Sequence, residues 1–149
     1  VGQANSAMRK LKSKGLDLLI PELKQPVLGI CLGMQLMCDF SEEGNTDCLK
    51  IFGSNVKKFD NSVKVPQIGW NTVFDLKTSL FESINENEYM YLVHSYYVPI
   101  LKETVCKTNY GINYSTALKK NNFIGVQFHP EKSGSNGEIV LKNFLNNYK

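Results

Sequence analysis

The feature that most constrains this sequence is a short apolar run that ends on a cysteine between two glycines. Val27 to Ile30 follows Pro26 and contains only apolar residues and glycine, which is typical of a buried strand of a parallel sheet. Cys31 comes next, and Leu32 to Met37 has the composition of a helix. The pattern predicts a strand, a sharp turn at Cys31 and a helix, which is an arrangement of the α/β class.

The rest of the chain predicts more strands than helices. Apolar residues at 4, 7, 8 and 11 have helical spacing, with a stop signal at Gly15, and those at 139, 140, 144 and 145 indicate a C-terminal helix after Gly134 and Gly137. The predicted strands of the middle region are 55–59, 67–74, 89–98, 104–107, 112–117 and 123–128, the last two joined by a turn at 119–122. We therefore expect an open, mostly parallel sheet flanked by helices, with an antiparallel extension.

Composition narrows the class of protein further. The 149 residues are 42% hydrophobic and 21% charged, which fits one domain over 1–149. The net charge of +3 is spread along the chain and predicts neither a nucleic-acid nor a membrane partner. The longest apolar stretch, 26–38, is too short to span a bilayer. The N-terminus shows no targeting pattern, so a cytoplasmic location is expected.

Neither a metal nor a cofactor is expected. The sequence holds four cysteines without a C-x-x-C pair and two histidines without ligand spacing, so it shows no metal-site pattern. It also lacks a dinucleotide fingerprint and a phosphate-binding loop. In a reducing compartment the cysteines are expected to stay free thiols.

Cys31 is a candidate nucleophile because of its place at the strand-to-helix turn. Gly29 and Gly33 lie two residues to either side of it, where glycines would relieve the crowding of a strained turn. A cysteine at the start of a helix is close to free N–H groups, which should lower its pKa and could also hold an oxyanion. The alternative is a buried structural cysteine, and this motif by itself leaves both open.

A second motif supplies the base that a cysteine nucleophile needs. His129 follows a predicted apolar strand, and Glu131 could orient its imidazole. The carboxyl ends of strands in an open α/β sheet share one edge, so Cys31 and His129 can meet there. His94, in an aromatic strand, could compete as the base, but we favour a structural role because no carboxylate lies near it in the sequence. An unrelated surface histidine and glutamate remain the alternative for the second motif.

These residues resemble the class I, triad-type glutamine amidotransferases, which hydrolyse the side-chain amide of glutamine and deliver ammonia to a synthase. The resemblance rests on Gly-Ile-Cys-Leu-Gly-Met-Gln at 29–35 and Gln-Phe-His-Pro-Glu at 127–131. The segments 65–71, 93–97 and 129–134 are similar to the glutaminase subunits of imidazole glycerol phosphate synthases, from histidine biosynthesis. The resemblance covers the whole chain. Relatives that make anthranilate, GMP or carbamoyl phosphate share the first two motifs. They usually lack the combination of Gly-Trp-Asn, at 69–71 here, with Glu-Lys-Ser, at 131–133 here.

The resemblance implies a role for individual residues. Cys31 would be the nucleophile, His129 the general acid and base, and Glu131 the residue that orients His129. The other implied positions are Leu32, Val1 and Gly2 for the oxyanion, Gln35, Glu43, Ser95 and Tyr96 for glutamine, and Trp70 and Lys132 for the partner interface.

The resemblance also implies a partner. Ammonia would pass to a (β/α)₈-barrel cyclase subunit that forms imidazole glycerol phosphate and AICAR. The present chain would thus be a hydrolase that supplies ammonia to the lyase reaction of its partner. Because the sequence stops soon after the last predicted helix, we expect a heterodimer of separate chains. Family members carry a first strand, helix and second strand before the position of Val1, so we expect a chain that lacks this N-terminal βαβ part and whose own activity depends on it.

Two alternatives to this interpretation remain. The chain could be the glutaminase subunit of another amidotransferase, or a hydrolase of glutamine-like amides without a partner. It could instead be a non-catalytic domain that retains the fold, which the presence of Cys31, His129 and Glu131 disfavours.

Overall fold

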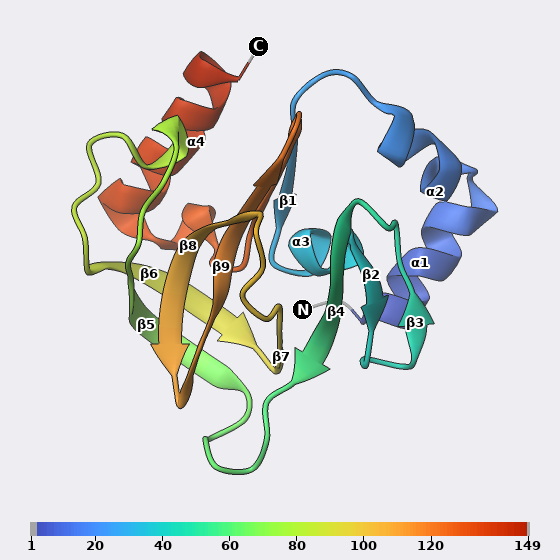
Figure 1. Cartoon of the computed structure of the whole chain (residues 1–149), viewed down its shortest axis with the longest axis horizontal. Coiled ribbons are helices and arrows are strands. Elements are labelled where there is room, and N and C mark those ends of the chain that lie inside the picture. The colour runs from blue at the N-terminus through green and yellow to red at the C-terminus, as the bar shows by residue number, and fades with distance from the viewer. Residues whose placement is uncertain (1–2, 149) are drawn as a thin grey trace.

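The computed structural model describes residues 3–148, and its α/β class agrees with the sequence. The helices are α1 (Ala4–Ser13), α2 (Leu16–Leu19), α3 (Leu32–Leu36) and α4 (Gly134–Asn147), with short 3₁₀ helices η1 (Ile20–Glu22), η2 (Ser79–Phe81) and η3 (Pro130–Lys132). The strands are β1 (Val27–Ile30), β2 (Cys38–Ser41), β3 (Thr46–Asp47), β4 (Phe52–Lys58), β5 (Gln67–Val73), β6 (Glu88–His94), β7 (Tyr96–Tyr97), β8 (Thr104–Tyr110), β9 (Ile112–Lys120) and β10 (Phe123–Val126). Figure 1 shows α4 on one side of β1 and β9, and α1 with α2 on the other.

The strands form mixed sheets. One sheet has the order β1-β10-β9-β8, a second has β3-β2-β4-β7, and β5 pairs with β6. Among the described strands, β1 with β10 and β2 with β4 pair in parallel, and the other pairings are antiparallel. The antiparallel part is thus larger than the sequence indicated. Tight turns join β8 to β9 and β9 to β10, and such short connections permit only antiparallel neighbours.

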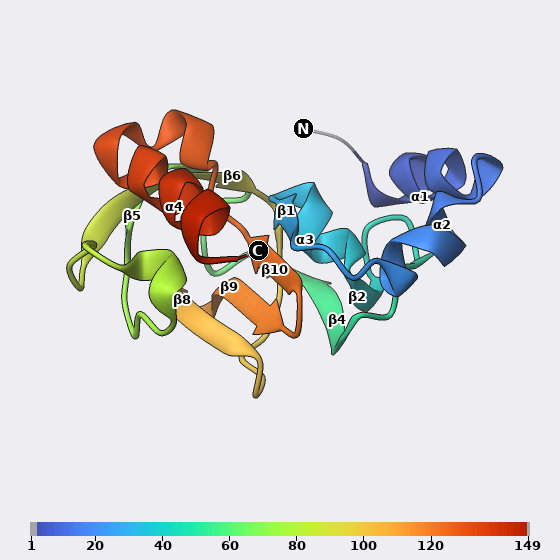
Figure 2. The same ribbon diagram turned by 90° about the horizontal axis from the view of Figure 1, so that it is seen from above.

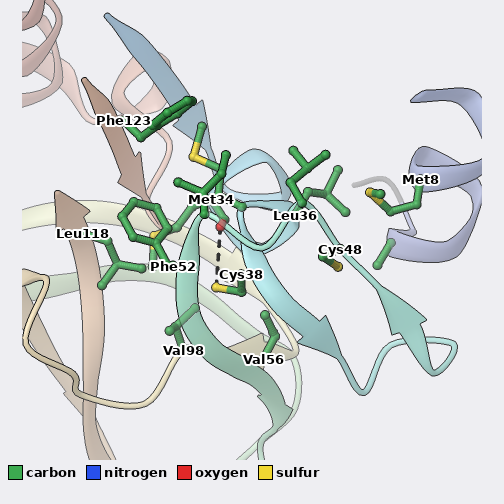
Figure 3. Close-up of a cluster of buried hydrophobic side chains, with 14 residues drawn as sticks. Met8, Met34, Leu36, Cys38, Cys48, Phe52, Val56, Val98, Leu118 and Phe123 are labelled. Atoms are coloured by element: carbon green, nitrogen blue, oxygen red, sulfur yellow. Dashed lines mark hydrogen bonds between the residues drawn. The ribbon is translucent and has the colours of Figure 1, made fainter. Parts of the chain in front are cut away.

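The core has two parts, one on each face of the sheet that contains β10. Phe123 on β10 belongs to a cluster with Met34 of α3, whereas Ile124 and Val126 belong to a second cluster with Val140 of α4. Successive residues of a strand point to opposite faces, so β10 supplies both clusters. Figure 3 shows the first cluster, and Figure 2 shows α4 and α1 at opposite ends of the molecule.

Two glycines let α3 lie directly on the sheet. Gly29 of β1 and Gly125 of β10 are partners in the parallel pairing. A Cβ atom on Gly29 would lie 2.8 Å from the carbonyl carbon of Gly33, and one on Gly125 would lie 2.6 Å from Cγ of Met34. Gly33 itself has no atom within 4 Å of its Cβ position. The expectation that both glycines beside Cys31 relieve crowding is therefore wrong for Gly33, which faces open space.

This difference gives a paired prediction. Gly29→Ala should lower the free energy of unfolding by about 1–3 kcal/mol, because α3 must move away from the strand. Gly33→Ala, its control, should leave stability unchanged or raise it by about 0.5–1 kcal/mol, since glycine is disfavoured inside a helix. Urea unfolding of the two variants checks this. Equal losses for both would contradict the packing described.

Several elements differ from those predicted. The strands β2 and β3 were not predicted, because they are short and lack a clear alternation. The predicted strand 89–98 is interrupted at Ser95, so that β6 and β7 belong to different sheets. Gly134 and Gly137 lie within α4 rather than before it, and a Cβ atom on Gly137 would overlap the carbonyl oxygen of Pro130. None of the helices in residues 3–148 is long and apolar enough to cross a membrane.

Candidate active site

Cys31 occupies a strained turn between β1 and α3. Its backbone has φ 51° and ψ −104°, a region that residues other than glycine rarely adopt. Its N–H donates to the carbonyl of Val126 over 2.7 Å, which continues the pairing of β1 with β10 by one residue. The turn between a strand and a helix that the sequence indicated is thus present, although only Gly29 of the strand is buried and the other residues of β1 are partly buried.

A cavity of about 140 Å³ opens beside this turn. Its lining residues are Cys31, Leu32, Gln35, Glu43, Pro66, Val93, His94, Ser95 and Tyr96. They come from the β1–α3 turn and α3, the loop after β2, the loop before β5, and the end of β6 with the break after it and the start of β7. The structure therefore brings together one expected nucleophile, one expected oxyanion donor and all four residues expected to bind glutamine. The other two expected oxyanion residues, Val1 and Gly2, lie outside the described residues.

The thiol of Cys31 is buried and hydrogen-bonded. Its Sγ lies 3.9 Å from the carbonyl oxygen of Val93 and accepts a hydrogen bond from Nε2 of Gln127 over 3.5 Å. Burial raises the pKa of Cys31, while the Leu32 N–H and the Gln127 amide act to lower it. The sequence-based expectation of a lowered pKa is therefore wrong, because desolvation outweighs the hydrogen bonds. In this environment the thiol needs a base to become a nucleophile.

Gln35 and Glu43 are both fixed by hydrogen bonds. Nε2 of Gln35 donates to the carbonyl of Tyr96 and to Oε1 of Gln127, each over 2.9 Å. Oε2 of Glu43 accepts the N–H of Ala4 at the start of α1 over 2.8 Å. Glu43 is thus a half-buried carboxylate on the cavity wall rather than a solvated loop charge.

His129 and Glu131 form the pair that their spacing suggested. Nδ1 of His129 lies 2.7 Å from Oε1 of Glu131. Nε2 of His129 is buried and has no hydrogen-bond partner among residues 3–148. With Nδ1 engaged by the carboxylate, Nε2 is the atom available to exchange a proton.

The backbone around His129 is tied to β6. The His129 N–H donates to the carbonyl of Tyr91 over 2.9 Å. The hydroxyl of Ser133 donates to the carbonyl of His129 over 2.7 Å and accepts the Tyr91 N–H over 2.9 Å. His129 does not line the cavity, and within residues 3–148 no hydrogen bond joins it to Cys31. The two residues follow the carboxyl ends of paired parallel strands, in which Ile30 is opposite Val126.

His94 lies in a buried network, which supports the structural role. Its Nδ1 lies 2.7 Å from the carbonyl oxygen of Tyr96 and its Nε2 lies 3.2 Å from the hydroxyl of Tyr114. Burial lowers the pKa of His94 from 6.5 to about 4. The imidazole is therefore neutral at physiological pH.

Acid should weaken the fold through His94. Below pH 6.5 His94 is protonated in the unfolded chain, whereas in the native state it stays neutral until about pH 4. The free energy of unfolding therefore falls as the pH drops across this range. We expect this residue to account for a loss of about 2 kcal/mol between pH 7 and pH 4.5. Urea unfolding at both pH values checks this, with His94→Gln as the non-titrating control. An identical pH dependence in the two proteins would contradict the assignment.

The expected interface residues Trp70 and Lys132 contact a common neighbour, Tyr91. The Trp70 and Tyr91 rings meet edge to face at 5.9 Å, and Nζ of Lys132 lies 5.8 Å from the centre of the Tyr91 ring. Ile68 and Tyr89 on the same strands are more than half exposed, as is Trp70. We call these five residues, Ile68, Trp70, Tyr89, Tyr91 and Lys132, the β5–β6 outer face.

Tyr91 and Gln127 were not singled out from the sequence. The signal for Tyr91 was the alternation of an aromatic strand, which places it two residues before Val93 of the cavity and on the same face. Gln127 was part of the quoted motif without a role. Its contact with Cys31 follows from the parallel register, which sequence spacing alone does not reveal.

The described part of the chain shows neither a cluster of metal ligands nor a disulfide. Within residues 3–148 no three side chains of His, Cys, Asp or Glu gather as metal ligands. All four cysteines are buried free thiols. The side chains that line the cavity include a thiol, an imidazole and a carboxylate.

The chain has sequence relatives of high identity. The glutamine amidotransferase class I family model matches residues 9–148. The chain is 55% identical over 148 residues to the imidazole glycerol phosphate synthase subunit HisH of Bacteroides fragilis, covering 97% of this chain and 76% of that one. It is 50% identical over 147 residues to the subunit of the same name from Haemophilus influenzae, covering 97% and 74%.

Solved structures with low identity share the fold. A glutamine amidotransferase from Thermotoga maritima matches with a TM-score of 0.63 at 19% identity, covering 99% of this chain and 60% of that one. Another solved glutamine amidotransferase matches with a TM-score of 0.69 at 11% identity, covering 96% and 75%. With a family match over residues 9–148 and relatives at 50% identity or more, the chain belongs to the class I glutamine amidotransferase family.

Proposed function

We propose that this protein is the glutaminase subunit of an imidazole glycerol phosphate synthase in histidine biosynthesis, with residues 1–149 in one amidotransferase domain. It would hydrolyse glutamine to glutamate and ammonia in the cytoplasm. The identity to subunits of that enzyme supports the assignment. The observation that carries it is a buried thiol on a strained turn, beside a cavity lined by Gln35, Glu43, Ser95 and Tyr96.

The proposed reaction begins at Cys31. Its Sγ attacks the side-chain carbonyl carbon of glutamine while the thiol proton passes to Nε2 of His129, which lacks another partner among the described residues. The raised pKa of the thiol makes this base necessary. The Leu32 N–H would stabilise the negative oxygen of the tetrahedral intermediate. Glu131 keeps the proton of His129 on Nδ1 and stabilises the imidazolium.

The same groups complete the reaction. His129 returns the proton to the departing nitrogen, which leaves as ammonia, and a thioester forms between Cys31 and the glutamyl carbonyl. Water then attacks the thioester, giving its proton to His129, and the proton returns to Sγ as glutamate leaves. The reaction consumes one glutamine and one water and produces one glutamate and one ammonia.

Substrate glutamine carries an ammonium and a carboxylate on its α-carbon, and both would need partners on the cavity wall. Glu43 uses Oε2 for Ala4, which leaves its other oxygen for the ammonium. Ser95 and Tyr96 lie at the break between β6 and β7, where backbone N–H groups and the Ser95 hydroxyl can receive the carboxylate. Gln35 would complete the binding site through its carbonyl oxygen.

We also propose a partner, a (β/α)₈-barrel cyclase that forms a heterodimer with this chain and consumes the ammonia. The β5–β6 outer face is its docking surface, because its exposed apolar side chains continue into Val93 at the rim of the cavity. Exposed tryptophan and tyrosine side chains are typical of interface anchors.

Variants of the outer face test the partner. Trp70→Ala and Lys132→Ala should each weaken binding of the cyclase about tenfold or uncouple glutamine hydrolysis from imidazole formation. Lys142→Ala is the matched control, because Lys142 is an exposed lysine on α4 that pairs with Glu138. Each variant is titrated with the cyclase while glutamate and the imidazole product are measured. Unchanged affinity and unchanged product ratio in both variants would exclude this surface.

A further inference from the structure

Gln127 is a buried amide for which the reaction above gives no role. It lies directly after β10, is fully buried, and donates its backbone N–H to the carbonyl of Thr116 over 2.8 Å. Its side chain lies between Gln35 and Cys31 and contacts both through polar atoms. A buried amide is costly unless its polar atoms are satisfied, so this placement needs both contacts.

The direction of these hydrogen bonds is fixed by chemistry. The carbonyl oxygen of Tyr96 can only accept, so the atom of Gln35 that faces it over 2.9 Å must be the amide nitrogen. That nitrogen also faces the Gln127 amide over 2.9 Å, so the Gln127 atom there must be the oxygen. Nε2 of Gln127 is then the atom turned toward Sγ of Cys31 at 3.5 Å. The chain of contacts thus presents an N–H donor, and never an acceptor, to the sulfur.

We propose that Gln127 is a positioning residue that holds an N–H donor against Sγ of Cys31 and favours its thiolate, an inference that rests on the proposed role of Cys31 as nucleophile. The protonated thiol has a different partner, since its hydrogen can point to the carbonyl of Val93 at 3.9 Å. A charged acceptor strengthens a hydrogen bond, so the Gln127 contact gains strength as the proton leaves. Hydrogen bonding from Gln127 opposes the burial that raises the pKa of Cys31.

The same amide ties the sulfur to the glutamine-binding wall. Gln35 is held in its position by donating to both Tyr96 and Gln127. A displacement of Gln35 would therefore release the Gln127 amide from its orientation toward Cys31. Binding of substrate and readiness of the sulfur are linked through one side chain.

The test measures the thiol itself, in the intact protein and without substrate. Gln127→Met keeps the volume and removes the donor. Gln127→Glu keeps an oxygen toward Gln35 but places a second ionisable group beside the sulfur. Gln67→Met is the control, because Gln67 is another buried glutamine whose amide bonds to the Tyr114 hydroxyl and not to sulfur. Alkylation of Cys31 by iodoacetamide is followed against pH by peptide mass spectrometry, with thermal melting to verify folding.

Loss of one hydrogen bond to a charged acceptor should raise the apparent pKa of Cys31 by about one to two units in Gln127→Met. Gln127→Glu should raise it further, because a carboxylate and a thiolate disfavour each other. Gln67→Met should leave the profile unchanged. Profiles in both Gln127 variants that coincide with the parent protein, or an equal shift in Gln67→Met, would overturn the proposal. Failure of the proposed function would instead appear as glutamine hydrolysis by a protein without Cys31, and that result would not alter these thiol profiles.

Discussion

Cys31→Ala is expected to reduce glutamine hydrolysis by about 10⁴-fold or more, because the variant lacks the thiol that forms the proposed thioester. Folding should be preserved, since the change removes one sulfur atom from the turn. Binding of the cyclase, and imidazole formation supplied with free ammonia, should also persist. Glutamate release and ammonia-dependent synthesis, measured in the same complex, check these expectations.

The other thiols provide matched controls. Cys38, Cys48 and Cys106 are buried like Cys31, and burial raises the pKa of each; for Cys48 it rises to about 11. None of the three lines the cavity. Alanine at these positions should change stability by the loss of a small buried group and leave the rate of hydrolysis within a few-fold. Comparable glutamate release by Cys31→Ala and the parent protein would contradict the nucleophile assignment.

His129→Ala should lower the rate of hydrolysis by about 10³-fold or more, because the buried thiol would lose the base that accepts its proton. The effect should fall mainly on kcat, since His129 does not line the cavity that would hold glutamine. Glu131→Gln should cost less, because Glu131 is half exposed and an amide can still accept from Nδ1. Steady-state kinetics of glutamate release with the cyclase bound measures each effect.

A double variant gives the control for this second prediction. Residues that act as one catalytic unit lose their effect together, so Cys31→Ala with His129→Ala should be no slower than Cys31→Ala. An additive loss would show that His129 acts on something other than the thiol. A His129→Ala enzyme that retains the parent kcat would remove His129 from the reaction.

Local signals in the sequence predicted the elements that matter most for the site. The run at 27–30, the cysteine after it and the His129–Glu131 spacing each act within a few residues, so the turn at Cys31 and the 2.7 Å contact of His129 with Glu131 could be anticipated. The hairpin before β10 followed from its turn residues. A general rule for parallel strands predicted that Cys31 and His129 follow their strands at the same edge of the sheet.

What the sequence did not reveal depends on contacts between distant segments. The raised pKa of Cys31 comes from burial by several elements, whereas the predicted lowering considered only the turn itself. Tyr91 links Trp70 on the paired strand β5 to Lys132 in η3, and no local pattern encodes these contacts. Gln127 reaches Cys31 because β1 and β10 are in register. The strands β2 and β3 escaped notice because strand pairing, of β2 with β4 and of β3 with β2, stabilises them rather than their own alternation.

The parallel pairing of β1 with β10 sets how this protein can tolerate changes in chain length. Cys31, Gln127 and His129 are placed by their distance along the chain from the paired glycines, Gly29 and Gly125. One residue inserted between 125 and 129 would turn the following side chains to the opposite side of the strand. A residue inserted in the exposed loop near 61 would leave that distance untouched. Insertions in remote loops should therefore leave the site intact. Insertions in the few residues after either glycine should disrupt it.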